Sequence, residues 1–397
     1  MISRMVSLYP CCAMEEFDIG IVGLGALGSA AAYHAASKGN TRVVGFEQFE
    51  LGHVHGASHD TSRIVRTSYD QAEYVALAKS AYKDWRALEK ATGLRLLDIT
   101  GGVVFLSKDG SVTPAQYTSS LDANQVPYEL LSPEQVNERW PQFDIPKGIE
   151  TVYCADTGIV HASRSVTAMQ YLARQYGATL KDRTPVVDIS PQKDGGVIVN
   201  TSQGKFKVRK LILTADAWIN KLLSPLGAEL PLSVSQEQIT YFKPSNPSNY
   251  DSPKFPVWMW AADHHFYGFP CYGEPTIKAG RHCGENWMTP DQRTYVHSEQ
   301  LLQQLINQLN KFMPDAERQV LRTITCQYTL TPEHHFVLSP LEKYKDIIVG
   351  LGSGHAFKFT PVIGRILAEL AIDGKSTENL TRFGIPKDPN AQLPSKL

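Results

Sequence analysis

The sequence predicts an α/β (α+β) protein in which a Rossmann-like dinucleotide-binding domain is interleaved with a second, mostly antiparallel β domain. Three observations predict it. A strand, a glycine-rich turn, a helix and a second strand follow one another over residues 17–46. Further strands typical of the same domain return at 210–215 and 346–354. The segments between them, about 90–155 and 230–325, are rich in aromatic residues and strand formers.

The first unit contains the motif GxGxxG in its full context. Residues 17–22 are a buried strand, 29–37 an alanine-rich helix, and 41–46 a second strand that ends at Glu47. Gly23 permits the tight turn, Gly25 lets the backbone approach a pyrophosphate, and Gly28 permits close helix packing. Glu47, about twenty residues on, can accept a hydrogen bond from a ribose hydroxyl. This context favours a dinucleotide site over a glycine-rich turn that binds nothing, but it does not distinguish FAD from NAD.

The later strands are predicted to complete that domain. Residues 179–199 resemble a β-meander with a turn at Gly195 and Gly196, and 210–215 form a buried strand. Residues 346–354 form a strand entering a glycine-rich turn, and a helix follows over 361–373. The aromatic-rich segments would then form the second layer.

Composition excludes several classes of protein. The 397 residues carry 39 Lys plus Arg and 40 Asp plus Glu, a formal charge of -1, so there is no basic surplus for a nucleic acid. No run of residues is long and apolar enough to span a membrane. The six cysteines show neither a CxxC pair nor zinc spacing, so we expect free thiols and no metal.

The two ends are expected to be flexible, over residues 1–14 and 386–397. The last three residues, Ser395, Lys396 and Leu397, match a peroxisomal address that an import receptor reads at a C-terminus. In a eukaryotic source they predict a peroxisomal protein.

Two pairs of cations are candidates for chemistry. Arg63 and Arg66 are three residues apart, so on a helical turn they share a face that could meet phosphate, flavin or a substrate anion. Two solvated surface arginines are the alternative. Lys278 and His282 are four apart, and on a strand they point to one side. On an interior strand Lys278 would be a buried cation, whereas on an edge strand both would be solvated.

Two further segments precede or follow the last dinucleotide-domain strand. Cys326 is by itself as compatible with a small buried apolar side chain as with a reactive thiol. The turn from Ser353 to Lys358 has main-chain N–H groups that could bind an anion or a flavin carbonyl.

The order of these pieces from about Phe17 to Phe383 resembles the monomeric sarcosine oxidase family of flavoproteins, which includes the peroxisomal sarcosine and pipecolate oxidases. The resemblance implies that FAD is the cofactor. It also implies a division into a discontinuous FAD domain (15–90, 155–230 and 325–385) and a substrate domain (91–154 and 231–324).

The resemblance also implies roles for individual residues. Arg63 would lie over the flavin, Lys278 would activate oxygen, and His282 with Tyr328 would act in the substrate pocket. Arg66 and Lys358 would bind the substrate carboxylate beside Tyr267, and Cys326 would carry FAD as a thioether. The implied cofactor-binding residues are Gly23, Gly25, Gly28, Glu47, Ser58, Arg63, Cys326, Gly354, His355, Phe357 and Lys358.

Three departures from the family pattern concern pocket shape. Leu351-Gly352 stands where the family has Gly-Phe, Ala356 stands where Gly is usual, and Asp216 replaces a Gly. They put the identity of the substrate in question, not that of the cofactor.

The implied reaction is oxidation of a secondary-amine amino acid, such as sarcosine, an N-methyl amino acid or L-pipecolate, by a monomeric enzyme that reduces O2 to H2O2. One alternative substrate class is a larger N-substituted amino acid, such as saccharopine, a fructosyl amino acid or a biosynthetic relative. Alternatives of another class are a noncatalytic dinucleotide-binding protein and an NAD-dependent dehydrogenase.

Overall fold

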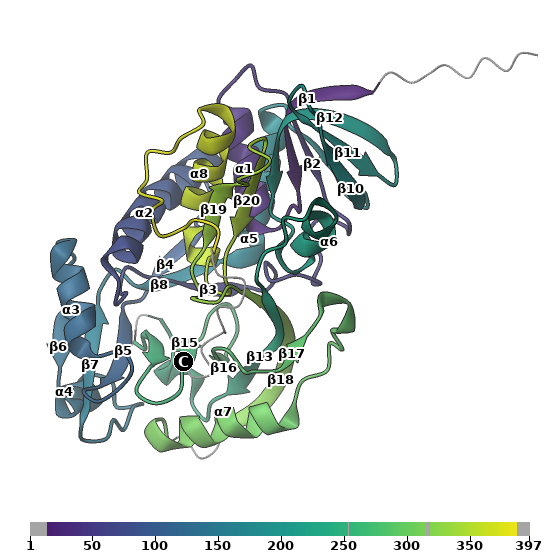
Figure 1. Ribbon diagram of the computed structural model, residues 1–397. Coiled ribbons are helices and arrows are strands. Elements are labelled where there is room, and N and C mark those ends of the chain that lie inside the picture. The colour runs from purple at the N-terminus through teal and green to yellow at the C-terminus, as the bar shows by residue number, and fades with distance from the viewer. Residues whose placement is uncertain (1–13, 253, 315–317, 387–397) are drawn as a thin grey trace, which may run out of the picture.

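The computed structural model describes residues 14–252, 254–314 and 318–386. Two large β-sheets, each covered by helices, form the upper and lower parts of the molecule in Figure 1. A small three-stranded sheet lies between them, made of β3 (Ser62–Val65), β8 (Gly158–His161) and β4 (Leu97–Ile99). The chain passes repeatedly between the two parts, so both contribute to the space between them.

The upper sheet is built on parallel strands. β1 (Glu15–Val22) lies between β2 (Val43–Phe46) and β12 (Gly204–Leu213), and β9 (Thr179–Lys181) extends the sheet beyond β2. The other edge of β12 pairs with two different strands. Its first half pairs with the hairpin of β11 (Val197–Thr201) and β10 (Val186–Pro191), and its end pairs with β20 (Ile347–Leu351), which is joined by β19 (Val337–Pro340).

Small residues bring helices close together over this sheet. α1 (Ala26–Ser37) buries six alanines, and in α8 (Thr360–Ile372) a Cβ on Gly364 would lie 2.3 Å from the Ala30 Cβ. α5 (Ala162–Gln175) and α2 (Ala72–Thr92) complete the helical layer, and α6 (Ile219–Leu223) follows β12. The close packing fixes the N-terminus of α1 above the strand ends.

The lower sheet is mostly antiparallel. Its strands are β5 (Gly102–Ser107), β6 (Glu129–Leu131), β7 (Ile149–Cys154), β13 (Ser233–Lys243), β14 (Val257–Trp260), β15 (Phe266–Phe269), β16 (Ile277–Arg281), β17 (Trp287–Met288) and β18 (Gln319–Leu330). Only β5 and β14 pair in parallel. α7 (Glu299–Phe312) buries Phe312 against the aromatic core around Phe105 and Trp258. α3 (Pro114–Ala123) and α4 (Pro133–Arg139) lie beside β6 and β7 in Figure 1.

The predicted fold class and the N-terminal unit are confirmed. One element is wrong: β9 is not part of a meander, because it pairs in parallel with β2, and only β10 and β11 form the hairpin. The predicted domain boundary at 325 falls inside β18, which pairs with β13 over its whole length. β4, from the predicted substrate segment, pairs with β8 of the other domain. All three strands pair with segments that lie far away in the sequence, and such pairings are not visible in the local pattern of residues.

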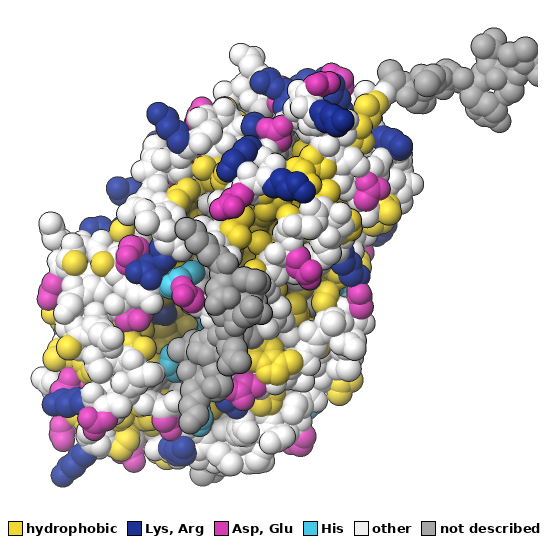
Figure 2. Space-filling model, in the orientation of Figure 1, with side chains coloured by type: hydrophobic (Ala, Val, Ile, Leu, Met, Phe, Trp, Pro, Cys, Tyr) yellow, Lys and Arg dark blue, Asp and Glu magenta, His cyan; other side chains and the backbone are white. Residues whose placement is uncertain are grey.

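Figure 2 shows Lys and Arg interspersed with Asp and Glu over the visible face, so neither sign forms a continuous field there. Within the described ranges, no helix has the length and apolar character needed to cross a membrane. The tripeptide Ser395–Leu397 and nearly all of the two ends expected to be flexible lie outside the described residues.

Candidate active site

A cavity of about 630 Å³ lies between the upper and lower sheets, lined by residues of both. It brings together segments from across the whole chain. The predicted site residues that line it are Gly23, Gly25, Glu47, Ser58, Arg63, Arg66, Tyr267, Lys278, His282, Cys326, Tyr328, Gly354, His355, Phe357 and Lys358. Gly28 does not line the cavity and lies in α1 behind the turn.

The glycine-rich turn is packed so tightly that side chains would not fit. Gly23 has a φ of +90°, and a Cβ there would lie 2.6 Å from the Thr214 carbonyl oxygen. A Cβ on Gly28 would lie 1.8 Å from the Gly23 oxygen. Ser58 Oγ accepts a hydrogen bond from Ala26 N at 2.9 Å, which attaches the 56–62 loop to the start of α1. The resulting helix N-terminus faces the cavity and suits a phosphate.

Glu47 lies at the end of β2 with its carboxylate held by main-chain donors. Its oxygens accept hydrogen bonds from Leu24 N at 2.9 Å and Phe49 N at 3.1 Å, and His53 Nε2 lies 3.4 Å away. Burial opposes ionisation, but the hydrogen bonds from His53 and the main chain outweigh it and lower the pKa of Glu47. An ionised carboxylate at this place can accept from the hydroxyls of a ribose.

Unpaired polar groups on the cavity wall also suit a long, polar cofactor. Gln327 is fully buried and lines the cavity, and neither atom of its amide has a hydrogen-bond partner within the described chain. Leaving a buried polar group unpaired costs about 1–3 kcal/mol, a cost that a bound group with donors and acceptors removes. The turn, Glu47 and this amide together fit FAD.

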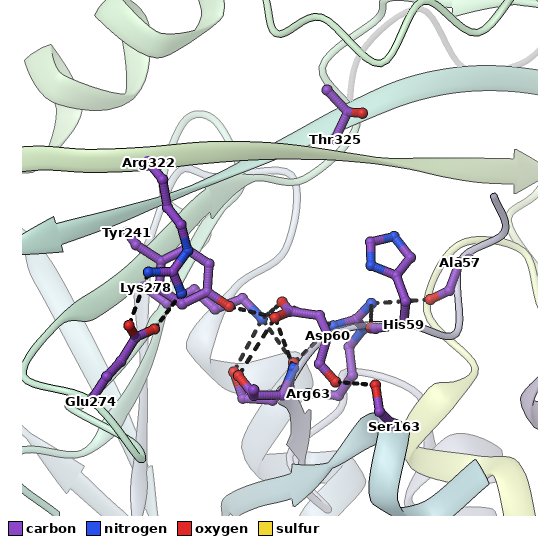
Figure 3. A network of polar contacts seen from close by, with 12 residues as sticks. Ala57, His59, Asp60, Arg63, Ser163, Tyr241, Glu274, Lys278, Arg322 and Thr325 are labelled. Carbon is purple, nitrogen blue, oxygen red and sulfur yellow. Dashed lines mark hydrogen bonds and ion pairs between the residues drawn. The ribbon is translucent and has the colours of Figure 1, made fainter. Parts of the chain in front are cut away.

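Lys278 is a buried cation at the centre of the polar network in Figure 3. Its strand, β16, is interior, between β13 and β15, so the edge-strand alternative does not apply. Lys278 Nζ donates to Asp60 Oδ2 at 2.6 Å, Ser62 O at 2.8 Å and Ser62 Oγ at 3.1 Å. Burial and the Arg63 charge outweigh the attraction of Asp60 and lower the pKa of Lys278 to about 8.

Arg63 and Arg66 do not lie on a helical turn. Residues 62–65 form strand β3, so the prediction of a shared helical face is wrong. Arg63 donates to Ala57 O at 3.0 Å, His59 O at 2.8 Å and Ser62 O at 2.9 Å. It lies 5.8 Å from the centre of the Phe357 ring.

Arg66 and Lys358 instead meet at a different aromatic ring. The guanidinium of Arg66 lies 4.0 Å from the centre of the Tyr69 ring and donates to Ser68 O. Lys358 Nζ lies 5.8 Å from the same ring and donates to His355 O at 2.8 Å. Burial, followed by the charges of Arg66 and Arg63, holds the pKa of Lys358 well below its ordinary value. A carboxylate between the two cations would relieve this repulsion.

Three polar side chains of the lower sheet line the cavity: Tyr267 of β15, Tyr328 of β18 and His282, which directly follows β16. His282 Nδ1 lies 3.4 Å from the hydroxyl of Tyr328, which also hydrogen-bonds Tyr267. Burial lowers the pKa of His282 to about 3, so its ring is neutral at physiological pH. A neutral imidazole can accept a hydrogen bond from a substrate amine.

Cys326 is buried in β18 with an exposed fraction of 6% and faces the cavity. Burial raises the pKa of its thiol to about 11, against the opposing effect of the nearby Arg63 charge. Sequence reasoning missed its neighbour Arg293, which donates to Thr325 O at 2.6 Å and His55 O at 2.7 Å. Arg293 thereby joins the loop that contains His55 to β18, and nothing in its local sequence indicates this.

The model of the family described as "FAD dependent oxidoreductase" matches residues 18–370. The peroxisomal sarcosine oxidase of Homo sapiens is 32% identical over 386 residues, covering 95% of this chain and 97% of that protein. The monomeric sarcosine oxidase of Bacillus sp. (strain NS-129) is 30% identical over 381 residues, covering 94% and 97%.

Solved structures agree. The open form of NikD, described as an unusual amino acid oxidase essential for nikkomycin biosynthesis, has a TM-score of 0.82 and 27% identity, covering 94% of this chain and 98% of that one. L-proline dehydrogenase from P. horikoshii, at 23% identity with a TM-score of 0.82 and coverage of 94% and 97%, supports the fold. The chain therefore belongs to the FAD-dependent oxidoreductases and, among them, to the sarcosine oxidase family of flavin-dependent amine oxidases, as its sequence predicts.

Proposed function

We propose that this enzyme oxidises a secondary-amine amino acid, such as sarcosine, an N-methyl amino acid or L-pipecolate, and reduces O2 to H2O2. The observation that carries the proposal is that one cavity, which the glycine-rich turn also lines, contains both a cation pair around Tyr69 and the buried Lys278. The first suits a substrate carboxylate, and the second suits the negative charge that O2 acquires on reduction.

The residues expected to hold FAD are those of the turn, with Glu47, Ser58 and the second turn at Gly354. Bound FAD would take a hydride from the carbon next to the substrate nitrogen and pass two electrons to O2. The chain itself supplies orientation and charge, because no side chain accepts a hydride.

Substrate orientation is assigned to the cation pair and the neutral wall. Arg66 and Lys358 would hold the carboxylate, and the His282 imidazole with the Tyr328 hydroxyl would face the amine. Fixing both ends brings the reacting carbon within about 3–3.5 Å of its acceptor. The amine loses a proton as the hydride leaves, and water then hydrolyses the imine.

Covalent attachment of FAD is assigned to Cys326 as a thioether. The support is its position in the cavity wall and its proximity to the cations Arg63, Arg293 and Lys278, whose charges favour the thiolate. The bond would replace the S–H bond of Cys326 and a C–H bond of the flavin, so attachment would need a base for the thiol proton, whose pKa is raised, and O2 to take up the two electrons as H2O2.

Two of the three sequence departures compensate one another. A Cβ on Gly352 would lie 2.5 Å from the Ala356 Cβ, so the glycine leaves room for the alanine. Asp216 is different: it has a φ of +46° and lines the cavity, and burial raises its pKa to about 6. The change at Asp216 is therefore the one that alters the polarity of the wall.

Oxygen consumption tests the proposal. We expect turnover with sarcosine, other N-methyl amino acids or pipecolate, accompanied by stoichiometric H2O2. Saccharopine and a fructosyl amino acid belong in the same screen, because a larger N-substituted amino acid is the alternative substrate class and NikD, described as an unusual amino acid oxidase, is among the similar structures. Absence of flavin from the purified protein, or oxidation of none of these compounds, would contradict the proposal.

The cellular setting is assigned on the C-terminal tripeptide alone. We expect import into peroxisomes by the receptor that recognises Ser395–Leu397. We also expect the protein to be a monomer in solution. Fluorescent fusions with and without the last three residues test the first, and light scattering tests the second.

A further inference from the structure

We propose that Asp60 is a positioning residue, which fixes the Lys278 side chain within the cavity wall and keeps its ammonium charged during reaction with O2. The inference rests on the role proposed above for Lys278. Figure 3 shows the two side chains pointing toward each other from the 56–62 loop and from β16.

The contacts of Lys278 leave it little freedom. Its side chain has an exposed fraction of 4%, and its three hydrogen bonds go to Asp60 and to two atoms of Ser62. Nζ also lies 4.8 Å from the centre of the Phe269 ring. Asp60 is the only anion among these contacts, so it alone provides a counter-charge.

Asp60 is itself held from several sides. Its Oδ1 accepts from the Tyr241 hydroxyl at 2.6 Å and from Thr61 N at 2.7 Å. Its carbonyl oxygen accepts from Ser163 Oγ at 2.9 Å. The residue has a φ of +86°, a backbone conformation that non-glycine residues rarely adopt and that persists only where the surroundings impose it.

The charges around Asp60 and Lys278 determine how removal of the Asp60 carboxylate affects Lys278. Arg63 Nη1 lies 3.6 Å from Asp60 Oδ2, so one carboxylate serves two cations. The other charged or titratable groups that interact with the pair are His59, His161, Tyr241, Glu274 and Cys326. Burial opposes ionisation of Asp60, but Lys278 and Arg63 outweigh it and hold its pKa far below the ordinary value.

Without that carboxylate, burial and Arg63 would act on Lys278 unopposed, and the ammonium would lose its proton at a lower pH. An opposite charge at this distance shifts a pKa by about one to three units. Asp60 thus decides whether Lys278 is a cation at the pH at which the enzyme works.

The test is the reoxidation of substrate-reduced enzyme by O2, followed in a stopped-flow instrument across pH. In Asp60→Asn we expect the pH at which the rate falls to half to move down by about one to three units, with the rate recovering in acid. Tyr241→Phe is the matched control, because it removes a hydrogen bond to the same carboxylate and keeps its charge, so its midpoint stays close to that of the wild type. A midpoint in Asp60→Asn equal to that of the wild type would overturn the proposal.

Lys278→Met separates this inference from the role on which it rests. It should be slow to reoxidise at every pH, with no recovery in acid. If Lys278→Met reoxidises at the wild-type rate, the oxygen role of Lys278 fails whatever Asp60→Asn does.

Thermal unfolding gives a second readout that needs no turnover. Lys278→Met should lower the melting temperature of the wild type and raise that of Asp60→Asn, because in the latter it removes a buried amine that has lost its ionic partner. Equal shifts in both backgrounds would show that the two residues are not coupled and would overturn the proposal. If Asp60→Asn alone does not fold, folding of the double variant supports the proposal and its failure to fold contradicts it.

Discussion

Arg66 and Lys358, from opposite ends of the sequence, lie at 4.0 Å and 5.8 Å from the centre of one ring, that of Tyr69. Arg66 reaches it from the end of β3 and Lys358 from the turn before α8. The two cations line a single cavity and repel each other there. An anion that binds both cations would stabilise such an arrangement, so we expect amino acids to be better substrates than plain amines.

Arg66→Ala should weaken binding of the amino-acid substrate by about one to two powers of ten, because a charge-assisted hydrogen bond is worth about 1.5–3 kcal/mol. The measurement is the dissociation constant from anaerobic titration of the flavin spectrum. Arg95→Ala is the control, since the Arg95 side chain is 77% exposed and lies outside the cavity lining. Equal binding by both variants would remove Arg66 from the substrate site.

Cys326→Ala should convert covalently bound flavin into flavin that acid precipitation releases into the supernatant. Cys271→Ala is the matched control, because Cys271 is also buried but does not line the cavity. Release of all the flavin from the unmodified protein would show that no covalent bond exists.

Lys278→Met should slow reoxidation by O2 by orders of magnitude and change anaerobic reduction by substrate much less, since the cation acts on oxygen. In the wild type, reoxidation should decline as pH rises above about 8, because the ammonium deprotonates there. The two half-reactions are measured separately by stopped flow, and equal slowing of both would contradict the assignment.

Gly28→Ala should destabilise the protein by about 1–3 kcal/mol or more, because its Cβ would overlap the Gly23 carbonyl oxygen in the turn. Thermal unfolding measures this. Gly384→Ala is the control, since a Cβ there meets nothing within 4 Å. A melting temperature unchanged by Gly28→Ala would show that the turn adjusts freely.

The sequence predicts the features that depend on local patterns, and it misses those that depend on contacts between distant residues. The turn at Gly23–Gly28 and the acidic residue at Glu47 are local patterns with a fixed spacing, so they were predicted correctly as a strand–turn–helix–strand unit. The spacing of Arg63 and Arg66 is compatible with a shared face of a helical turn, and it does not reveal that β3 pairs with β8, about a hundred residues later.

Asp60 shows the same limit at the site. Its partner Lys278 is 218 positions away, and a single aspartate in a polar loop carries no local signal of an ion pair. The positive φ at Asp60 and the burial of both side chains appear only in the folded chain.

The most direct test of the account compares a substrate with its methyl ester at one pH in the same oxygen-consumption assay. The ester keeps the secondary amine and the reacting carbon but lacks the negative charge that Arg66 and Lys358 are expected to bind. We predict that the free acid is oxidised with a kcat/KM at least about ten times that of the ester. Equal values for the two compounds would contradict the account and indicate an uncharged amine as the substrate.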